Sequence, residues 1–157
     1  MMYLSKPPAI IRRLMRNNLT WSVDDRLDEI FITFDDGPIP EITPRVMEIL
    51  GKYNAKATFF CVGDNVAKHP DVYQQVLDAG HATGNHTFNH LNGWKTSLED
   101  YVANIQKCRQ IVDSRLFRPP YGRISPSHIS EIKLQYQIVM WSVLSGDFDQ
   151  NTSNERV

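Results

Sequence analysis

The chain has 157 residues, 41% of them hydrophobic and 22% charged, an ordinary globular composition that excludes extended disorder, collagen-like repeats and a small disulfide scaffold. Seventeen Lys and Arg residues against 18 Asp and Glu leave a formal charge of -1, which argues against nucleic acid as a partner and favours an uncharged or weakly charged substrate. We expect no membrane span, since no apolar segment approaches the required length of about 20 residues.

Residues 1–27 form a short basic segment that we expect to pack on the rest of the chain. Its apolar stretch, 8–11, is too short for the core of a signal peptide and is followed by further arginines. The sequence as written therefore shows no export signal, which indicates a cytoplasmic protein unless export takes another route to the cell envelope.

From about residue 28 onward, short apolar runs rich in β-branched and aromatic residues alternate with stretches of helical period. The pattern predicts strands over 29–34, 57–62, 81–84, 116–118 and 137–142. It predicts helices over 41–53, 70–79, 97–113 and 126–134. Such alternation is typical of an α/β fold, a parallel sheet or (β/α) barrel, which carries its chemistry at the carboxyl ends of the strands.

The clearest of these helices begins after Ser97, an N-cap with Asp100 three residues later. One face carries apolar residues at helical spacing and is predicted to be core: Leu98, Val102, Ile105, Cys108 and Val112. Cys108 and the second cysteine, Cys61, both lie among apolar neighbours, so we predict two buried free thiols.

Residues 28–157 contain no linker or repeat, and we interpret them as one domain. Five strands are few for a closed barrel, and 153–157 looks like the first turn of a helix that does not continue. We therefore expect the fold to be truncated, with the C-terminal part of the domain missing from this chain.

The first polar cluster follows the predicted strand 29–34. Asp35 and Asp36 come directly after it, and Gly37 and Pro38 form a turn dipeptide. Adjacent carboxylates repel each other unless a cation neutralises them, so the pair is a candidate for a metal site. A plain polar turn is the alternative interpretation of the same residues.

The second cluster contains two histidines, His86 and His90, after the predicted strand 81–84. At a spacing of four residues, two imidazoles share one helical face and can bind one divalent ion. An exposed pair without a ligand is the alternative. Combined with a carboxylate of the first cluster, the pair supplies the two imidazoles and one carboxylate of an open metal site with room for water.

A third cluster, 118–123, contains two consecutive prolines and a glycine. A loop so rigidified can present a fixed backbone N–H to an oxyanion while Arg118 pairs with a carboxylate, although a rigid connection alone is the alternative. Asp147 and Asp149 likewise follow the last predicted strand. Four aromatic residues are candidate stacking platforms for a ligand, with a place in the core as the alternative: Trp94, Tyr121, Trp141 and Phe148.

In this order, Thr33–Pro38, His86-x-x-x-His90 and Arg118–Gly122 resemble the first three motifs of the polysaccharide deacetylases with a NodB-like domain, the carbohydrate esterase family 4. The resemblance covers about residues 28–149. It implies a distorted (β/α) barrel of the polysaccharide deacetylase type. It also implies a hydrolase that uses metal-activated water to remove acetyl groups from an N- or O-acetylated polysaccharide or oligosaccharide.

Carried over to this sequence, the resemblance implies roles for individual residues. Asp36, His86 and His90 would bind a divalent metal, most often zinc, with cobalt, nickel or iron as alternatives. Asp35 would be the general base, and Arg118 would hold it in place. The backbone N–H of Tyr121 would stabilise the oxyanion.

Two departures from the family pattern stand out. In the fourth motif the family usually has an aspartate where this chain has Leu144 and a tryptophan where it has Phe148, while Asp147 remains as a candidate catalytic residue. The last motif, a Leu-x-His strand end that supplies the general acid, has no match.

The missing general acid motivates a second hypothesis, a carbohydrate- or metal-binding domain without turnover. A third hypothesis is a non-haem iron oxygenase, since two histidines and a carboxylate also hold ferrous iron, but the alternation of strands and helices disfavours it.

Overall fold

A computed structural model of the chain describes residues 8–23 and 28–146. Within these residues a single parallel sheet has its strands in chain order, β1-β2-β3-β4-β5. The strands are β1 (Thr33–Phe34), β2 (Thr58–Cys61), β3 (Ala82–Asn85), β4 (Leu116–Phe117) and β5 (Gln137–Ile138). The predicted α/β class with a parallel sheet is confirmed.

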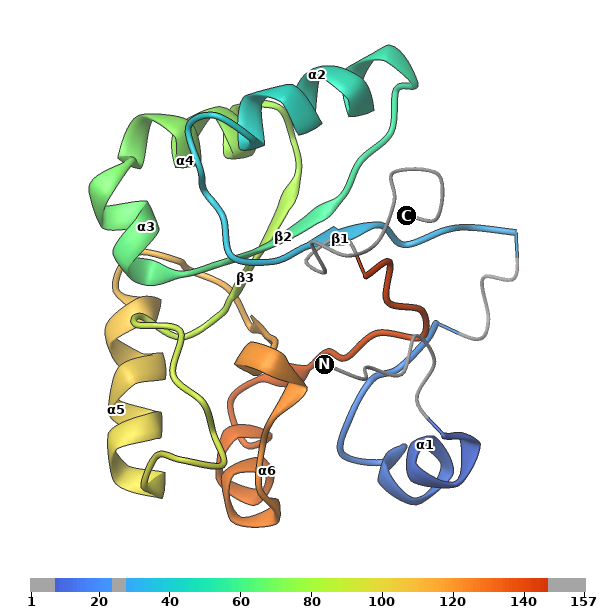
Figure 1. Cartoon of the computed structure of the whole chain (residues 1–157), viewed down its shortest axis with the longest axis vertical. Helices are drawn as coiled ribbons and strands as arrows, with labels where there is room; N and C mark the ends of the chain where they lie inside the picture. Colours follow the sequence, from blue (N-terminus) through green and yellow to red (C-terminus); the bar gives the residue numbers. More distant parts are fainter. Residues whose placement is uncertain (1–7, 24–27, 147–157) are drawn as a thin grey trace.

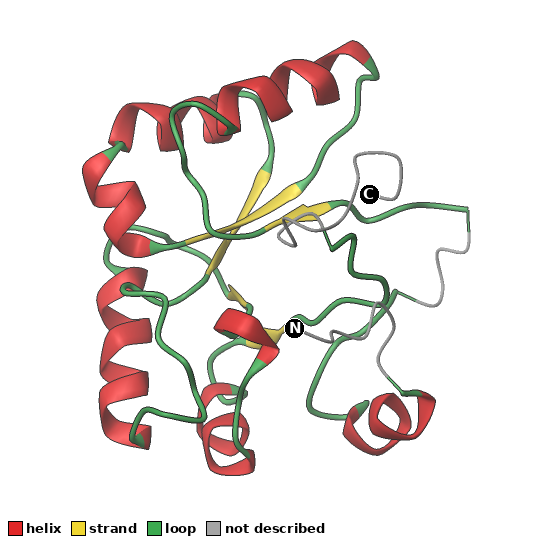
Figure 2. Cartoon of the chain, in the orientation of Figure 1, coloured by secondary structure: helices red, strands yellow, loops and turns green. Residues whose placement is uncertain are grey.

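Helices precede the sheet and connect its strands. They are α1 (Ala9–Met15), α2 (Thr43–Lys52), α3 (Gly63–Lys68), α4 (Pro70–Asp78), α5 (Leu98–Arg109), the short 3-10 helix η1 (Pro120–Gly122) and α6 (Pro126–Ile132). Figure 1 shows α2 to α6 arranged around one side of the strands, and Figure 2 shows the strands inside this helical layer. The four predicted helices are present, whereas α1 and α3 were not predicted from the sequence. None of the described helices is both long and apolar enough to cross a lipid bilayer.

The predicted strand 29–34 is shorter than its apolar pattern suggested. Only Thr33 and Phe34 pair with β2, because β2 itself starts at Thr58, the partner of Thr33. The side chains before them, Ile30, Phe31 and Ile32, are 88%, 55% and 38% exposed. An apolar run thus predicted the position of the strand correctly and its length incorrectly.

The N-cap of α5 is confirmed, since the Ser97 hydroxyl accepts a hydrogen bond from the backbone N–H of Asp100 at 3.1 Å. The predicted core face is confirmed at Ile105, Cys108 and Val112, which are buried. Leu98 is 38% exposed and Val102 is half-buried, while Tyr101, which was not predicted, is fully buried. The two buried free thiols are confirmed.

The outer face of the sheet packs on the helices through two apolar clusters. One lies around β2 and includes Leu50, Ala57, Phe59, Cys61, Val66, Val76, Cys108 and Val112. The other lies around β4 and β5 and includes Leu19, Tyr101, Ile105, Phe117, Ile129, Ile132, Tyr136, Ile138 and Met140. Leu19 comes from the N-terminal segment, whose Thr20 forms a parallel bridge with Val139 beyond β5.

Phe60 belongs to neither cluster, because alternation along β2 turns it to the opposite face from Phe59 and Cys61. Its ring is fully buried and lies against Gly84 of β3, where an added Cβ would come within 2.4 Å of the ring. The Arg118 guanidinium lies over the same ring, 4.1 Å from its centroid. A large ring and a buried cation thus fill the concave side of the sheet.

Arg118 also shows how strongly the sheet curves. Its guanidinium donates to the Thr33 hydroxyl of β1 at 2.7 Å and to the carbonyl oxygens of Val139 and Met140, just after β5, at 3.3 and 3.0 Å. Because β1 and β5 are the two edges of the five-stranded sheet, one side chain can reach both only if the sheet is curled. This curvature brings the carboxyl ends of all five strands toward one point.

Candidate metal centre

The two adjacent carboxylates after β1 point to different partners. Asp35 pairs with Arg118, whose Nη1 lies 2.7 Å from Asp35 Oδ1. Asp36 has a left-handed backbone conformation with φ of 69°, which turns its side chain toward the histidines. The Asn65 side chain donates to the Asp36 carbonyl oxygen at 2.7 Å and stabilises this turn. The turn of the backbone at the end of β1 therefore directs two chemically identical side chains to different partners.

The segment that carries both histidines is a loop, so the expectation of a shared helical face was wrong. Thr87 and His90 have left-handed φ values of 60° and 54°, which no regular helix contains. The buried Asn85 side chain accepts a hydrogen bond from the Thr87 N–H, and the Thr87 hydroxyl accepts one from the Leu91 N–H. These local side-chain bonds compete with helical hydrogen bonding and turn the chain back on itself.

Asn104 of α5 clamps the same loop from outside. Its Oδ1 accepts hydrogen bonds from the backbone N–H groups of Phe88 and Asn89 at 2.8 and 2.9 Å. Its Nδ2 donates to the Asn89 side chain at 2.9 Å. One side chain thus fixes the two residues that lie midway between His86 and His90.

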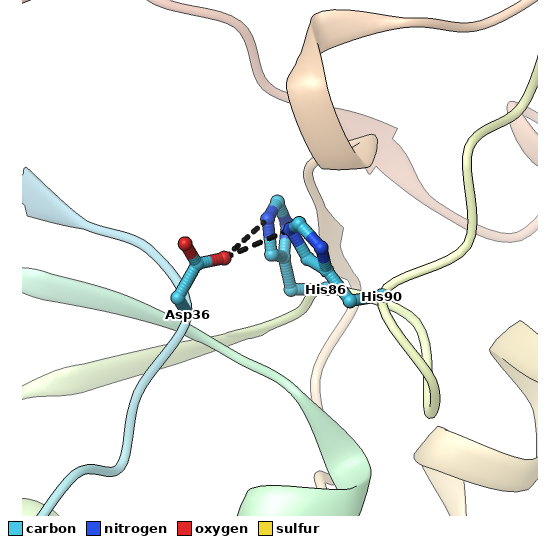
Figure 3. A group of neighbouring side chains, drawn as sticks. All are labelled: Asp36, His86 and His90. Carbon is cyan, nitrogen blue, oxygen red and sulfur yellow. Dashed lines mark ion pairs between the residues drawn. The ribbon is translucent and has the colours of Figure 1, made fainter. Parts of the chain in front are cut away.

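The result is a convergent triad (Figure 3). One ligand atom from each of Asp36, His86 and His90 lies within 4.8 Å of the other two. The Nε2 atoms of His86 and His90 are 3.4 and 2.9 Å from Asp36 Oδ1. His86 is buried, His90 is partly buried, and Asp36 is 58% exposed at its side chain. Among the described residues, these three form the group of His, Cys, Asp or Glu side chains whose ligand atoms lie close enough together to hold one metal ion.

The hydrogen bond made by the His86 ring tests whether the triad fits a metal. Its Nδ1 lies 2.7 Å from the carbonyl oxygen of Arg118. Since a carbonyl can only accept, Nδ1 is the donor in this bond, which leaves Nε2, on the side of Asp36, as the ring atom available to a metal. A backbone carbonyl that orients an imidazole through its other nitrogen is typical of metal sites. The residues therefore fit a divalent ion.

Asp36 and His90 complete the electrostatics of the site. The His86 and His90 rings, within hydrogen-bond distance of its carboxylate, hold the pKa of Asp36 well below its ordinary value, although burial opposes the shift. Asp36 therefore carries its negative charge throughout the neutral pH range. On the opposite side of the His90 ring, Nδ1 lies 3.1 Å from the Tyr121 hydroxyl, which can accept a hydrogen bond from it.

Tyr121 belongs to the loop after β4, where its own φ is 60°. The neighbouring backbone N–H groups of Gly122 and Arg123 donate back into the turn, to Pro119 and Pro120. The described residues provide no acceptor for the Tyr121 N–H. Gly122 lies in close contact with Trp141, because an added Cβ would come within 2.4 Å of the indole. The loop thus holds, on a rigid support, a backbone donor that has no acceptor within the described part of the chain.

An open pocket of about 320 Å³ adjoins the triad. It is lined by Asp36, Val62, Asp64, Asn65, Asn89 and His90. Amide and carboxylate side chains line most of it, which suits a hydroxyl-rich ligand.

Other candidates lie elsewhere. Asp147 is outside the described residues, and so is Phe148. His128, which belongs to none of the motifs above, is buried in α6 with its Nδ1 against the Ser125 hydroxyl and its ring edge-on to Tyr101. Sequence reasoning missed Asn65 and Asn104, because an isolated asparagine in a helix carries no signal of its distant partner.

Fold and site together define an α/β protein with a candidate divalent-metal centre of two imidazoles and one carboxylate. The sequence model of the polysaccharide deacetylase family matches residues 22–139. The chain therefore belongs to the polysaccharide deacetylase family, as its motifs indicated.

Individual relatives agree. Over 130 residues the chain is 42% identical to a peptidoglycan-N-acetylglucosamine deacetylase of Bacillus cereus, covering 79% of this chain and 61% of that protein. Over 138 residues it is 38% identical to a chitooligosaccharide deacetylase of Azorhizobium caulinodans, covering 80% and 66%. The crystal structure of the Bc1960 peptidoglycan N-acetylglucosamine deacetylase superposes with a TM-score of 0.80 at 30% identity, over 96% of this chain and 76% of that one. The chain thus spans less than two thirds of the two curated relatives.

Proposed function

We propose that the protein is a zinc-dependent deacetylase that removes the acetyl group from an N-acetylated sugar of a glycan. The observation that best supports this is the convergence of Asp36 with the two Nε2 atoms of His86 and His90, one of which is oriented by a backbone carbonyl. The two relatives described above are named for peptidoglycan N-acetylglucosamine and for chitooligosaccharides, and we propose a substrate of the same class.

Asp36, His86 and His90 would hold the zinc ion, which when bound polarises the acetyl carbonyl and lowers the pKa of a bound water. Asp35 then accepts the proton of the attacking water. Its Oδ1 is occupied by Arg118, so Oδ2 is the atom left for this proton, and its side chain is 31% exposed and within reach of solvent. The Tyr121 N–H, which has no acceptor among the described residues, donates to the acetyl carbonyl oxygen as it becomes an oxyanion. When the C–N bond breaks, the proton taken up by Asp35 passes to the leaving amine.

The matched pair Asp35→Asn and Asp36→Asn tests these assignments. Zinc affinity of the metal-stripped protein is measured by isothermal titration calorimetry, and acetate release is measured with chitooligosaccharides and N-acetylated peptidoglycan. We expect about one zinc per chain, tighter in the wild type than in Asp36→Asn because a neutral amide is a weaker ligand. We expect Asp35→Asn to keep its zinc affinity and to lose roughly a hundredfold in turnover.

Loss of zinc by Asp35→Asn with retention by Asp36→Asn would mean that the two roles are exchanged. A folded wild-type protein that binds no zinc would reject the metal centre. Zinc binding without acetate release from any substrate would favour the binding-domain hypothesis raised by the missing Leu-x-His motif.

A further inference from the structure

A tryptophan beside the metal centre is exposed and yet firmly held. Trp94 is 67% exposed, its backbone N–H donates to the Asn92 side chain at 3.0 Å, and its indole N–H donates to the Ile124 carbonyl at 3.2 Å. The preceding Gly93 lies directly on the backbone of Arg123, where an added Cβ would come within 2.5 Å of the carbonyl oxygen. The indole is therefore a fixed surface with little ordering left to complete on binding.

Arg123 lies near the rings of both Trp94 and Tyr121, and its charge has no ion-pair partner among the described residues. The guanidinium carbon of Arg123 is 5.3 Å from the Trp94 ring centroid and 5.8 Å from that of Tyr121. No described carboxylate lies within ion-pair distance of this partly buried side chain, and no hydrogen bond among the described residues uses its guanidinium. An aromatic ring near a guanidinium uses none of its N–H groups as conventional hydrogen-bond donors, and a guanidinium with free N–H groups matches a carboxylate.

This cluster of Trp94, Tyr121 and Arg123 is continuous with the metal centre. Tyr121 contacts the metal-ligand candidate His90 through its hydroxyl, and the two rings are 4.6 Å apart at their centroids. A glycan whose acetylated sugar lies at the triad would therefore extend across Tyr121 toward Trp94.

We propose that Trp94, Tyr121 and Arg123 form a second subsite, which binds a neighbouring sugar that carries a carboxylate. The apolar face of the sugar ring stacks on Trp94, and its carboxylate accepts two hydrogen bonds from the edge of the Arg123 guanidinium. The proposal deepens the proposed deacetylase function and rests on it. It selects acidic glycans over neutral ones of the same length.

The test compares two ligands that differ by one charge. The first is a peptide-free tetrasaccharide of alternating N-acetylglucosamine and N-acetylmuramic acid, and the second is its methyl ester. Binding to the zinc-loaded protein is measured by calorimetry in the Asp35→Asn background, so that the ligand is not consumed. We expect the acid to bind about tenfold more tightly than the ester, the scale of one charge-assisted contact.

Arg123→Gln should abolish this preference. The matched control is Arg109→Gln, since Arg109 lies over the Tyr136 ring at 5.7 Å in a different part of the molecule, and this variant should keep the preference. Trp94→Ala should weaken both ligands alike by about tenfold, the scale of a lost stacking contact with a sugar. Far-UV circular dichroism confirms that each variant is folded.

Equal binding of acid and ester to the wild-type chain, or a preference that survives Arg123→Gln, would overturn the subsite. Absence of binding by both ligands would overturn it too. These outcomes are independent of the proposed function, which fails only if zinc binding or acetate release fails with neutral chitooligosaccharides.

Discussion

Arg118 holds the two edges of the sheet together, so replacing it tests the curled architecture. In Arg118→Met the side chain keeps much of its length and its packing on Phe60 but loses four hydrogen bonds, two of them to the carbonyl oxygens of Val139 and Met140. Arg118 is 3% exposed, so water cannot easily replace those bonds.

The magnitude follows from the environment of each bond. The three bonds to Thr33, Val139 and Met140 have uncharged acceptors and contribute on the order of 1 kcal/mol each. Asp35 is 31% exposed, and its ion pair with Arg118 is discounted for solvent screening to about 1 kcal/mol. We expect Arg118→Met to lower the free energy of unfolding by about 4 kcal/mol, a large part of the roughly 5–15 kcal/mol of a typical domain.

Urea unfolding followed by far-UV circular dichroism measures this loss. The matched variant Asp35→Asn keeps an oxygen that accepts from Arg118 and should lose only about 1 kcal/mol. If Arg118→Met does not fold, Arg118→Lys keeps the charge with a single point of contact and should lose about half as much. Equal losses in the Arg118 and Asp35 variants would refute the reasoning, because the ion pair alone would then explain the effect.

Three further predictions concern the support of the site and the core. Asn104→Ala removes the clamp on the histidine loop and should weaken zinc affinity about tenfold in calorimetry with unchanged circular dichroism; unaltered affinity would mean that the loop is held without the clamp. Gly84→Ala forces a Cβ into the Phe60 ring and should destabilise the fold by about 1–3 kcal/mol in urea unfolding, so a neutral effect would contradict the tight packing. Burial raises the pKa values of the Cys61 and Cys108 thiols to about 12, so they should resist Ellman's reagent at pH 8 until the protein unfolds. Their contribution to stability is complete below the unfolded value of about 8.5 and decreases as the pH rises toward the folded value, so the urea midpoint should drop above that pH.

Local patterns were sufficient for the order of the elements and for the residues that meet at the site. Apolar runs and helical periods predicted the strands and four of the helices, since burial of one side determines both patterns. The position of the Asp pair after β1 and of the two histidines after β3 predicted that a carboxylate and both imidazoles converge, because parallel strands bring their carboxyl ends to one edge. The choice of Asp36 over Asp35 came from the family resemblance. The Ser97 N-cap was equally predictable from the sequence, because its hydrogen bond spans only three residues.

The tertiary structure decided what depends on distant partners. The strand 29–34 shrank to two residues because only β2 determines how far pairing extends. The histidines lie on a loop because Asn85 and the remote Asn104 supply hydrogen bonds that outweigh helix formation. Asp35 and Asp36 are chemically identical, and they are directed to different partners by a left-handed turn and by Arg118, which follows β4. The bonds of Asn104 and Arg118 join residues 16 and 83 positions apart, and no local propensity carries their signature.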